Sequence, residues 1–165
     1  VYRMLVLGFH FGAGVVDMVQ YKDVVRFREI RKLVSREVHS FREFLRFSQI
    51  EGMVYIAHFE PRSRVIMPVA SYFVDRMPSE NWMIIDDVHR EAIVHPKDET
   101  CYLRILTDDE IQALSCTERE DHYTRLWKKY FHTMGISQRE NRACQRNHFP
   151  LWMRKHVTEF QELCE

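Results

Sequence analysis

The stretch from His39 to Pro61 constrains the fold most, because the spacing of its apolar residues changes from a helical period to strict alternation. Residues 44–50 alternate as in an extended segment, and a second apolar run ends at Phe59. Glu51-Gly52 lies between the two runs and is typical of a turn. The pattern predicts a β-hairpin.

Arg46 lies on the opposite side of the first predicted strand from Leu45 and Phe47. We expect Leu45 and Phe47 to face the core. An arginine on the other, partly apolar side needs a partner, and Asp86 from a later strand is the favoured one. The alternative is that Arg46 belongs to a site that also contains His39 and Arg76.

A helix and a second hairpin follow the first hairpin. Residues 65–77 have helical spacing, and Pro78 ends the segment because the residue before proline disfavours the helical region. Strands are predicted over 82–86 and 91–95, with a further short strand over 101–106. The predicted fold class is α+β, a four-stranded antiparallel ββαββ sheet packed with an N-terminal helix and a C-terminal helical segment, with the helices on one face.

One domain over residues 1–165 is expected for a chain of 165 residues. It divides into a helical lead-in (1–43), a sheet unit (44–106) and a helical segment (107–165). The lead-in contains a short buried helix over 1–16 that breaks near Gly12, and a longer helix from Asp23 to Ser40. Because the chain starts with an apolar run and no Met, we expect it to be a fragment that lacks an upstream region.

The helical segment has three sequences that suit helix starts. They begin at Thr107, Thr117 and Ser137, and each has a glutamate three residues later, as in a capping box. A last helix is predicted from Pro150 to Leu163.

The charges are balanced overall but separated along the chain. Lys plus Arg and Asp plus Glu both number 24. Basic residues dominate 26–46 and 125–155, whereas acidic residues dominate 75–121. The basic residues of the long helix suit either a solvated face or a phosphate-facing one.

The cellular context follows from cysteine usage and hydropathy. The four cysteines form no C-x-x-C pair, which argues against a disulfide framework and a zinc site. No apolar run reaches the length of a membrane span, and no secretory signal opens the chain. We therefore expect a cytoplasmic protein with reduced thiols and no membrane contact.

No catalytic motif and no metal-ligand spacing stands out. The nine histidines include no H-E-x-x-H or helical His pair, so we predict no metal and no cofactor, with isolated histidines on a mixed surface. Asp86 and His39 are the functional candidates if the protein is a nucleic-acid enzyme. Whether it is an enzyme stays open. The paired acids at Asp86 and Asp87 more readily begin a turn.

The basic C-terminal segment suits phosphates better than any other part of the chain, because it gathers guanidinium and amide donors. Nearby aromatic residues could stack on bases, although their helical spacing favours a core role. The residues predicted to contact nucleic acid are Arg42, Arg46, Arg76, Arg139, Asn141, Arg142, Gln145, Arg146 and Lys155.

Three blocks of the sequence resemble a bacterial family. They are HSFREFLRFSQIEG, FEPRSRVIMPVASYFVDRMPSENWMIIDD and LWKKYFHTMGISQRENRACQRNHFPLWMRKHVTEF. In this order they are similar to the "probable DNA metabolism" proteins, also called SAM-link proteins. Recurrent positions of that family are matched by His39, Phe44, Arg46, Phe47, Phe73, Arg76, Trp82, Arg139, Asn141, Gln145 and Pro150. The chain departs at Glu43, where a small residue is expected, and at Phe149, where Met is usual.

The resemblance implies a DNA-related role beside a radical-SAM protein of DNA repair or modification, in a domain of unknown function that is also found fused to uracil-DNA-glycosylase-like domains. It supplies no reaction. The leading hypothesis is therefore an accessory DNA-binding domain that acts with the radical-SAM partner. The alternatives are a protein-interaction module that docks this partner through the acidic segment 75–121, and a DNA base-processing enzyme.

Overall fold

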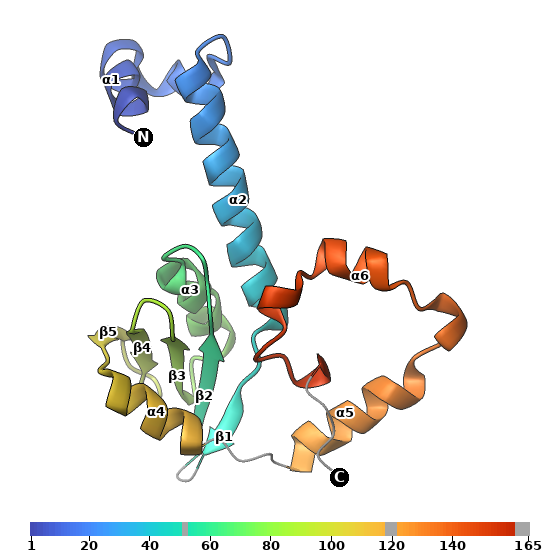
Figure 1. Cartoon of the computed structure of the whole chain (residues 1–165). Helices are drawn as coiled ribbons and strands as arrows, with labels where there is room; N and C mark the ends of the chain where they lie inside the picture. The colour runs from blue at the N-terminus through green and yellow to red at the C-terminus, as the bar shows by residue number, and fades with distance from the viewer. Residues whose placement is uncertain (51–52, 118–121, 161–165) are drawn as a thin grey trace.

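The computed structural model describes residues 1–50, 53–117 and 122–160 (Figure 1). The elements are α1 (Tyr2–Phe11), η1 (Gly12–Asp17), α2 (Lys22–Phe44), β1 (Ser48–Ile50), β2 (Val54–Phe59), α3 (Ile66–Arg76), β3 (Asn81–Asp86), β4 (Glu91–His95), β5 (Tyr102–Ile105), α4 (Asp108–Thr117), α5 (His122–Met134), η2 (Ser137–Arg139), α6 (Arg142–His148), η3 (Leu151–Met153) and η4 (Thr158–Phe160). The fold is α+β, with a sheet between N-terminal and C-terminal helices.

The sheet has five strands in the order β1-β2-β3-β4-β5. All neighbours are antiparallel except β2 and β3, which run parallel from the pair Val54 and Asn81 to the pair Phe59 and Asp86. The predicted four-stranded antiparallel sheet is therefore wrong in strand number and in the direction of this pair. The helix α3 explains the difference, because a strand-helix-strand connection returns the second strand parallel to the first.

Helices cover both faces of the sheet, whereas the sequence predicted one covered face. On one face, Trp82 and Ile84 of β3 pack in a cluster with α3 and the end of α2. On the other face, Ile85 packs with Leu106 and the apolar side of α4. Figure 1 shows α3 behind the strands and α4 in front of them. Because successive side chains of β3 point to opposite faces of the sheet, this strand contributes to both cores.

The helix α2 is longer than predicted and continues to Phe44. Residues 44–47 are therefore not part of a strand, and β1 begins only at Ser48. Leu45 is buried and Phe47 packs against the same core, as the sequence predicted. The predicted turn at Glu51-Gly52 lies outside the described residues.

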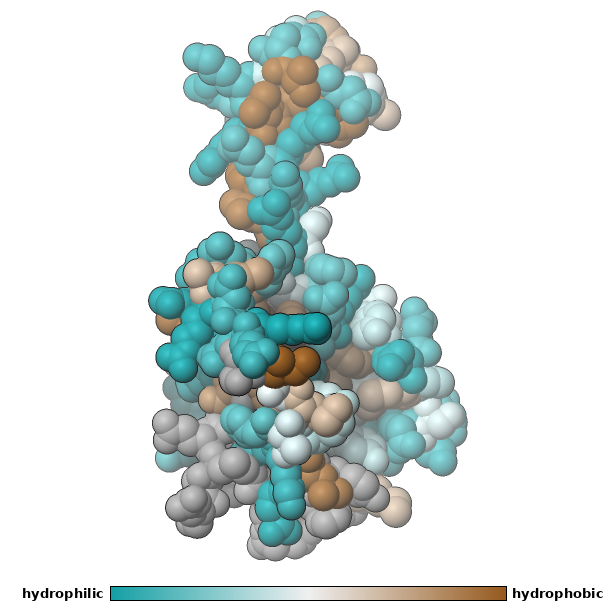
Figure 2. All heavy atoms as spheres, turned by 90° about the vertical axis from the view of Figure 1, so that its right-hand side faces the viewer, coloured by the Kyte–Doolittle hydropathy of each residue, from teal (hydrophilic) through white to brown (hydrophobic). Residues whose placement is uncertain are grey.

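The N-terminal half of α2 projects from the sheet and carries α1 and η1 at its far end (Figure 1). A small separate core forms there around Met4, Val15 and Val24. Figure 2 shows this end joined to the rest of the protein by the slimmer α2 segment. The helix of the lead-in breaks at Gly12 as predicted, but Met4 is its only buried residue, so the prediction of a buried helix is wrong.

The C-terminal helices α5 and α6 arch away from the sheet, and η3 and η4 return to it (Figure 1). The predicted helix from Pro150 to Leu163 is instead two short 3₁₀ turns over the described residues, and positions 161–163 lie outside them. The capping box predicted to begin at Thr117 extends into residues 118–121, which also lie outside the described ranges.

Within the described ranges, no single helix is long and apolar enough to cross a membrane. The consecutive segments Tyr2–Asp17 and Lys22–Phe44, bent by 63° to each other, meet the length and composition requirement only as a pair.

Candidate functional site

The C-terminal segment surrounds a groove of about 960 Å³. Its lining comes from α5, η2, α6 and the two 3₁₀ turns that follow. Its lining residues include Tyr130, Phe131, Arg139, Glu140, Arg142, Gln145, Arg146, Leu151, Arg154 and Phe160. We call this feature the C-terminal groove.

The charge of the C-terminal groove is strongly positive. Four arginines line it, and Glu140 is the one acidic residue among its described lining. Arg142 Nε lies 2.9 Å from Glu140 Oε1, in a pair whose arginine side chain is 79% exposed. An exposed pair of this kind contributes little to stability.

Aromatic rings connect Phe160 of the groove lining to the rest of the fold. Phe149 stacks on Phe44 at the end of α2 with ring centroids 4.1 Å apart, and Phe160 lies 5.6 Å from Phe149. The Arg154 guanidinium lies 4.4 Å from the Phe160 ring and donates to the Phe149 carbonyl oxygen at 2.9 Å and 3.1 Å. Arg154 is therefore held in place, while Tyr130 and Phe131 stay partly exposed.

The structure brings four of the predicted nucleic-acid residues together in this groove, namely Arg139, Arg142, Gln145 and Arg146. Asn141 has a different position and caps α6, where its Oδ1 accepts the backbone N–H of Cys144 at 2.9 Å. Sequence reasoning missed Arg154, although it is part of the same basic segment.

The remaining predicted residues lie elsewhere. Arg42 ties α2 to α3, because its Nε and Nη2 donate to the Pro68 carbonyl oxygen. Arg46 donates to the carbonyl oxygens of Glu43 and Leu45 and so stabilises the chain after α2. Arg76 is exposed at the end of α3, and Lys155 pairs with Glu60.

His39 and Asp86, the two candidate residues of the enzyme hypothesis, both lie outside the C-terminal groove. His39 is exposed on α2, with its Nε2 3.2 Å from Glu43 Oε1. Asp86 is fully buried, and its partner is His89 and not the predicted Arg46. The favoured pairing of Arg46 with Asp86 is therefore wrong.

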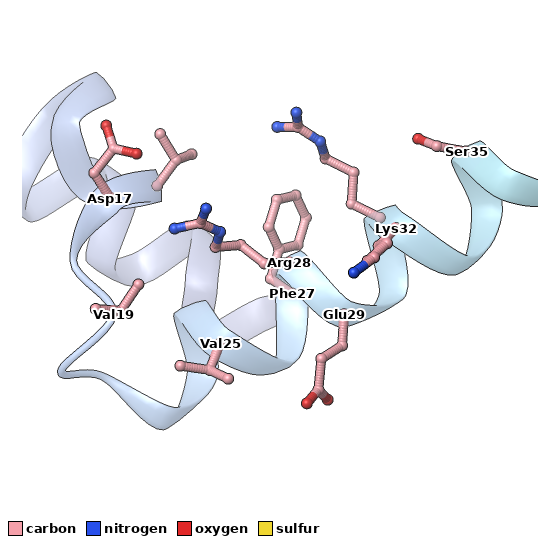
Figure 3. A pocket seen from close by; sticks show the side chains of 10 residues that line it. Asp17, Val19, Val25, Phe27, Arg28, Glu29, Lys32 and Ser35 are labelled. Carbon is pink, nitrogen blue, oxygen red and sulfur yellow. The ribbon is translucent and has the colours of Figure 1, made fainter.

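A second hollow of about 600 Å³ lies at the far end of α2, between η1 and the first turns of that helix. Figure 3 shows Arg28 and Phe27 on one side of α2, with Glu29 pointing away. Arg28, Arg31 and Lys32, three of the basic residues of the long helix, line it together with Asp17. All three basic residues are exposed, which suits both a solvated face and a phosphate-facing one.

A cluster of histidines and carboxylates lies at the carboxyl ends of β2 and β3. These strands are parallel neighbours, so Glu60 and Asp87, which follow them, reach the same edge of the sheet. The backbone N–H of Asp87 donates to the Phe59 carbonyl oxygen at 3.1 Å. His156, which follows η3, completes the cluster, with its Nε2 3.7 Å from Glu60 Oε1 and 3.7 Å from Asp87 Oδ2. We call Glu60, Asp87 and His156 the edge cluster.

His58 of β2 supports the edge cluster from inside the fold. Its Nδ1 lies 2.9 Å from Asp87 Oδ1, and its side chain is 2% exposed. The rings of His58 and His156 are stacked, with centroids 6.1 Å apart. The Nε2 atoms of both rings are buried and have no hydrogen-bond partner among the described residues.

Burial lowers the pKa of His156, and the carboxylates of Asp87 and Glu60 oppose this effect. His58 and His95 are both buried, so the prediction of surface histidines is wrong for these two. The predicted strands end at Phe59 and Asp86, so the sequence located both strand ends. It could not show that β2 and β3 are parallel neighbours, and this arrangement is what brings Glu60 and Asp87 together.

Comparison with known proteins identifies the family but no activity. Residues 1–159 match the family described as a domain of unknown function, DUF4130. The chain belongs to the DUF4130 family. No curated protein and no solved structure matches it significantly.

Proposed function

We propose that the protein binds single-stranded nucleic acid through the C-terminal groove. The observation that carries the proposal is the meeting of four arginines and several aromatic rings around one groove with a single described carboxylate. Guanidinium groups pair with phosphates, and aromatic faces stack on bases of any sequence.

The arrangement of the arginines suits a phosphate backbone. Arg139, Arg142 and Arg146 are exposed along η2 and α6, and Arg154 faces the same groove from the returning segment. Only Arg142 has an acidic partner among the described contacts of this group. A strand in the groove would meet positive charge from both sides.

The aromatic lining favours a single strand over a duplex. Tyr130 is 55% exposed and Phe131 is 40% exposed, so both offer ring surface to a ligand. Bases are free to stack on such rings only when they are not stacked within a duplex, and each stacked base contributes about 1–3 kcal/mol.

The sequence resemblance to SAM-link proteins supports DNA as the nucleic acid. In that context the protein would act as an accessory domain in bacterial DNA repair or modification, with a radical-SAM protein as its partner. The proposal includes no catalytic step of its own.

The test is a titration of the whole chain with a short labelled oligonucleotide at several salt concentrations, read by fluorescence anisotropy. We expect the single strand to bind more tightly than a duplex of the same sequence. With up to four phosphate contacts, the slope of log K against log salt should be about −3, since each contact to a single strand contributes about −0.7.

A double variant, Arg139→Gln with Arg146→Gln, should make this slope shallower by about 1.4 and weaken binding of all sequences alike. The matched control is Arg26→Gln with Arg28→Gln, which also removes two exposed arginines but at the distant end of α2. The proposal is wrong if no binding occurs at low salt, if binding is indifferent to salt, or if both variants behave alike.

A further inference from the structure

We propose that the edge cluster of Glu60, Asp87 and His156 is a binding site for a divalent transition-metal ion, with Zn²⁺ and Mn²⁺ as the best candidates. The inference is independent of the proposed nucleic-acid binding, because it concerns a different set of residues and needs no nucleic acid for its test.

The distances within the cluster suit a shared ion better than direct contact. One ligand atom from each of the three residues lies within 4.8 Å of the other two. Both carboxylate oxygens are 3.7 Å from His156 Nε2, which is too long for a hydrogen bond. Adjacent ligand atoms of a tetrahedral ion with bonds of about 2.1 Å are about 3.4 Å apart, so a small adjustment would complete the coordination.

An unsatisfied nitrogen faces the two carboxylates. His156 Nε2 is buried and lacks a hydrogen-bond partner within the described part of the chain. A buried polar atom without a partner is costly, and native folds rarely contain one. An ion between this nitrogen and the two carboxylate oxygens would give the nitrogen the partner that it lacks.

His58 provides a second, independent observation. Because an ionised carboxylate only accepts, the Nδ1 of His58 donates to Asp87 Oδ1, and this fixes the carboxylate and the tautomer of the ring. Its own Nε2 is then left with a free lone pair, buried in the same hollow that Glu60 and His156 line. A histidine that orients a ligating carboxylate is a common supporting residue of metal sites.

The composition of the set indicates the class of ion. One imidazole and two carboxylates suit zinc and manganese, and three protein ligands leave at least one position for water or an anion. Lys155 pairs with Glu60 at the exposed side of the cluster. The lysine pairs with Oε1, the same Glu60 oxygen that lies 3.7 Å from His156 Nε2, so a bound ion would share this oxygen with Lys155 or displace the lysine.

The location within the fold also suits a site. The edge cluster lies beyond the carboxyl ends of two parallel strands, where open sheets with parallel strands commonly bind ligands. Residues 151–160 contribute His156 to this cluster and Arg154 to the C-terminal groove. Occupation of the edge cluster would therefore fasten this segment to the sheet.

The experiment uses the whole chain after removal of metal by a chelator. Titration calorimetry with Zn²⁺, Mn²⁺ and Mg²⁺ measures affinity and stoichiometry, and thermal unfolding measures stabilisation. We expect one ion per chain, and an increase in Tm of about 5–10 °C at a free ion concentration 100 times the Kd. Mg²⁺ should bind much more weakly, because it prefers an all-oxygen shell.

Three variants locate the site. His156→Gln and Glu60→Gln each remove a ligand and should abolish both the heat of binding and the Tm increase. His58→Gln should weaken binding about 10- to 100-fold with the stoichiometry unchanged, because it acts only by orienting Asp87. The matched control, His148→Gln, removes an exposed histidine of α6 and should bind as the unaltered protein does.

Circular dichroism of each metal-free variant shows whether it folds, so a folding failure in one variant leaves the other to decide. Co²⁺ gives an additional signal, since its visible spectrum changes when a nitrogen and oxygen ligand set surrounds it. The inference is overturned if none of the ions stabilises the protein. It is equally overturned if His156→Gln and Glu60→Gln both fold and bind metal normally, since the residues would then form only an ion-pair network.

Discussion

At the scale of single residues, Asp86 shows how burial decides between a functional and a structural role. Its side chain has no exposed surface, and its Oδ1 accepts the backbone N–H groups of Val88 and His89 at 3.0 Å and 2.9 Å. Its Oδ2 lies 2.7 Å from His89 Nδ1. Burial raises the pKa of Asp86, and the donors from His89 and Val88 oppose this effect. The carboxylate thus builds the turn between β3 and β4.

We predict that Asp86→Ala lowers the free energy of unfolding by about 2–4 kcal/mol, because it leaves two N–H groups of the turn without an acceptor. Asp86→Asn retains an acceptor oxygen and should lose less. Because the pKa of Asp86 is raised in the folded state, its contribution to stability is present at low pH and is lost as the pH rises. The free energy of unfolding of Asp86→Asn, relative to that of the unaltered protein, should therefore increase above pH 3.8. Urea denaturation at several pH values measures both effects, and equal losses in the two variants would contradict the assignment.

At the scale of elements, α4 shows how a capping box in the sequence determines where a helix that covers the sheet begins. The Thr107 backbone N–H donates to Glu110 Oε2 at 2.9 Å, and the Glu110 backbone N–H donates to Thr107 Oγ1 at 3.4 Å, as the predicted capping box requires. Leu106, just before the box, is buried with Ile85 under α4. The cap therefore determines where α4 begins to cover this face.

We predict that Glu110→Gln weakens α4 at neutral pH and not at low pH. The donors of Thr107 and the charge of Arg104 lower the pKa of Glu110 below 4.5. A lowered pKa of an acid stabilises the fold above its usual value, and this contribution is lost as the pH falls through the folded-state pKa. Denaturation curves of the variant and the unaltered protein should therefore differ more at neutral pH than they do below pH 4.5. Glu99→Gln, in the loop after β4, is the matched control, and an identical effect there would contradict the prediction.

At the scale of the whole molecule, the two ends of α2 belong to different cores. Val24 packs with Met4 and Val15 at one end, whereas Val38 and Phe41 pack with the sheet at the other. The segment of α2 between them is mostly exposed. The small N-terminal core can therefore open while the sheet stays folded.

We predict that Val24→Ala increases hydrogen exchange in residues 2–17 and leaves residues 81–95 unchanged. The substitution removes part of a fully buried side chain from a small core, at a local cost of about 1–3 kcal/mol. Ile84→Ala, at the centre of the sheet, should instead increase exchange in both regions through global unfolding. Exchange measured by mass spectrometry checks this, and increased exchange of the sheet in Val24→Ala would show that the two cores unfold together.

The sequence by itself determined the positions of most elements, because each depends on local spacing and on breakers such as Pro78. It also determined the basic character of residues 125–155, from which three predicted arginines and one predicted glutamine meet in the C-terminal groove. Only the tertiary structure decided the parallel pairing of β2 and β3, since strand direction depends on where α3 packs. That pairing, with the return of residues 151–160 to the sheet, assembles the edge cluster from residues far apart in the chain, and no local pattern could reveal it.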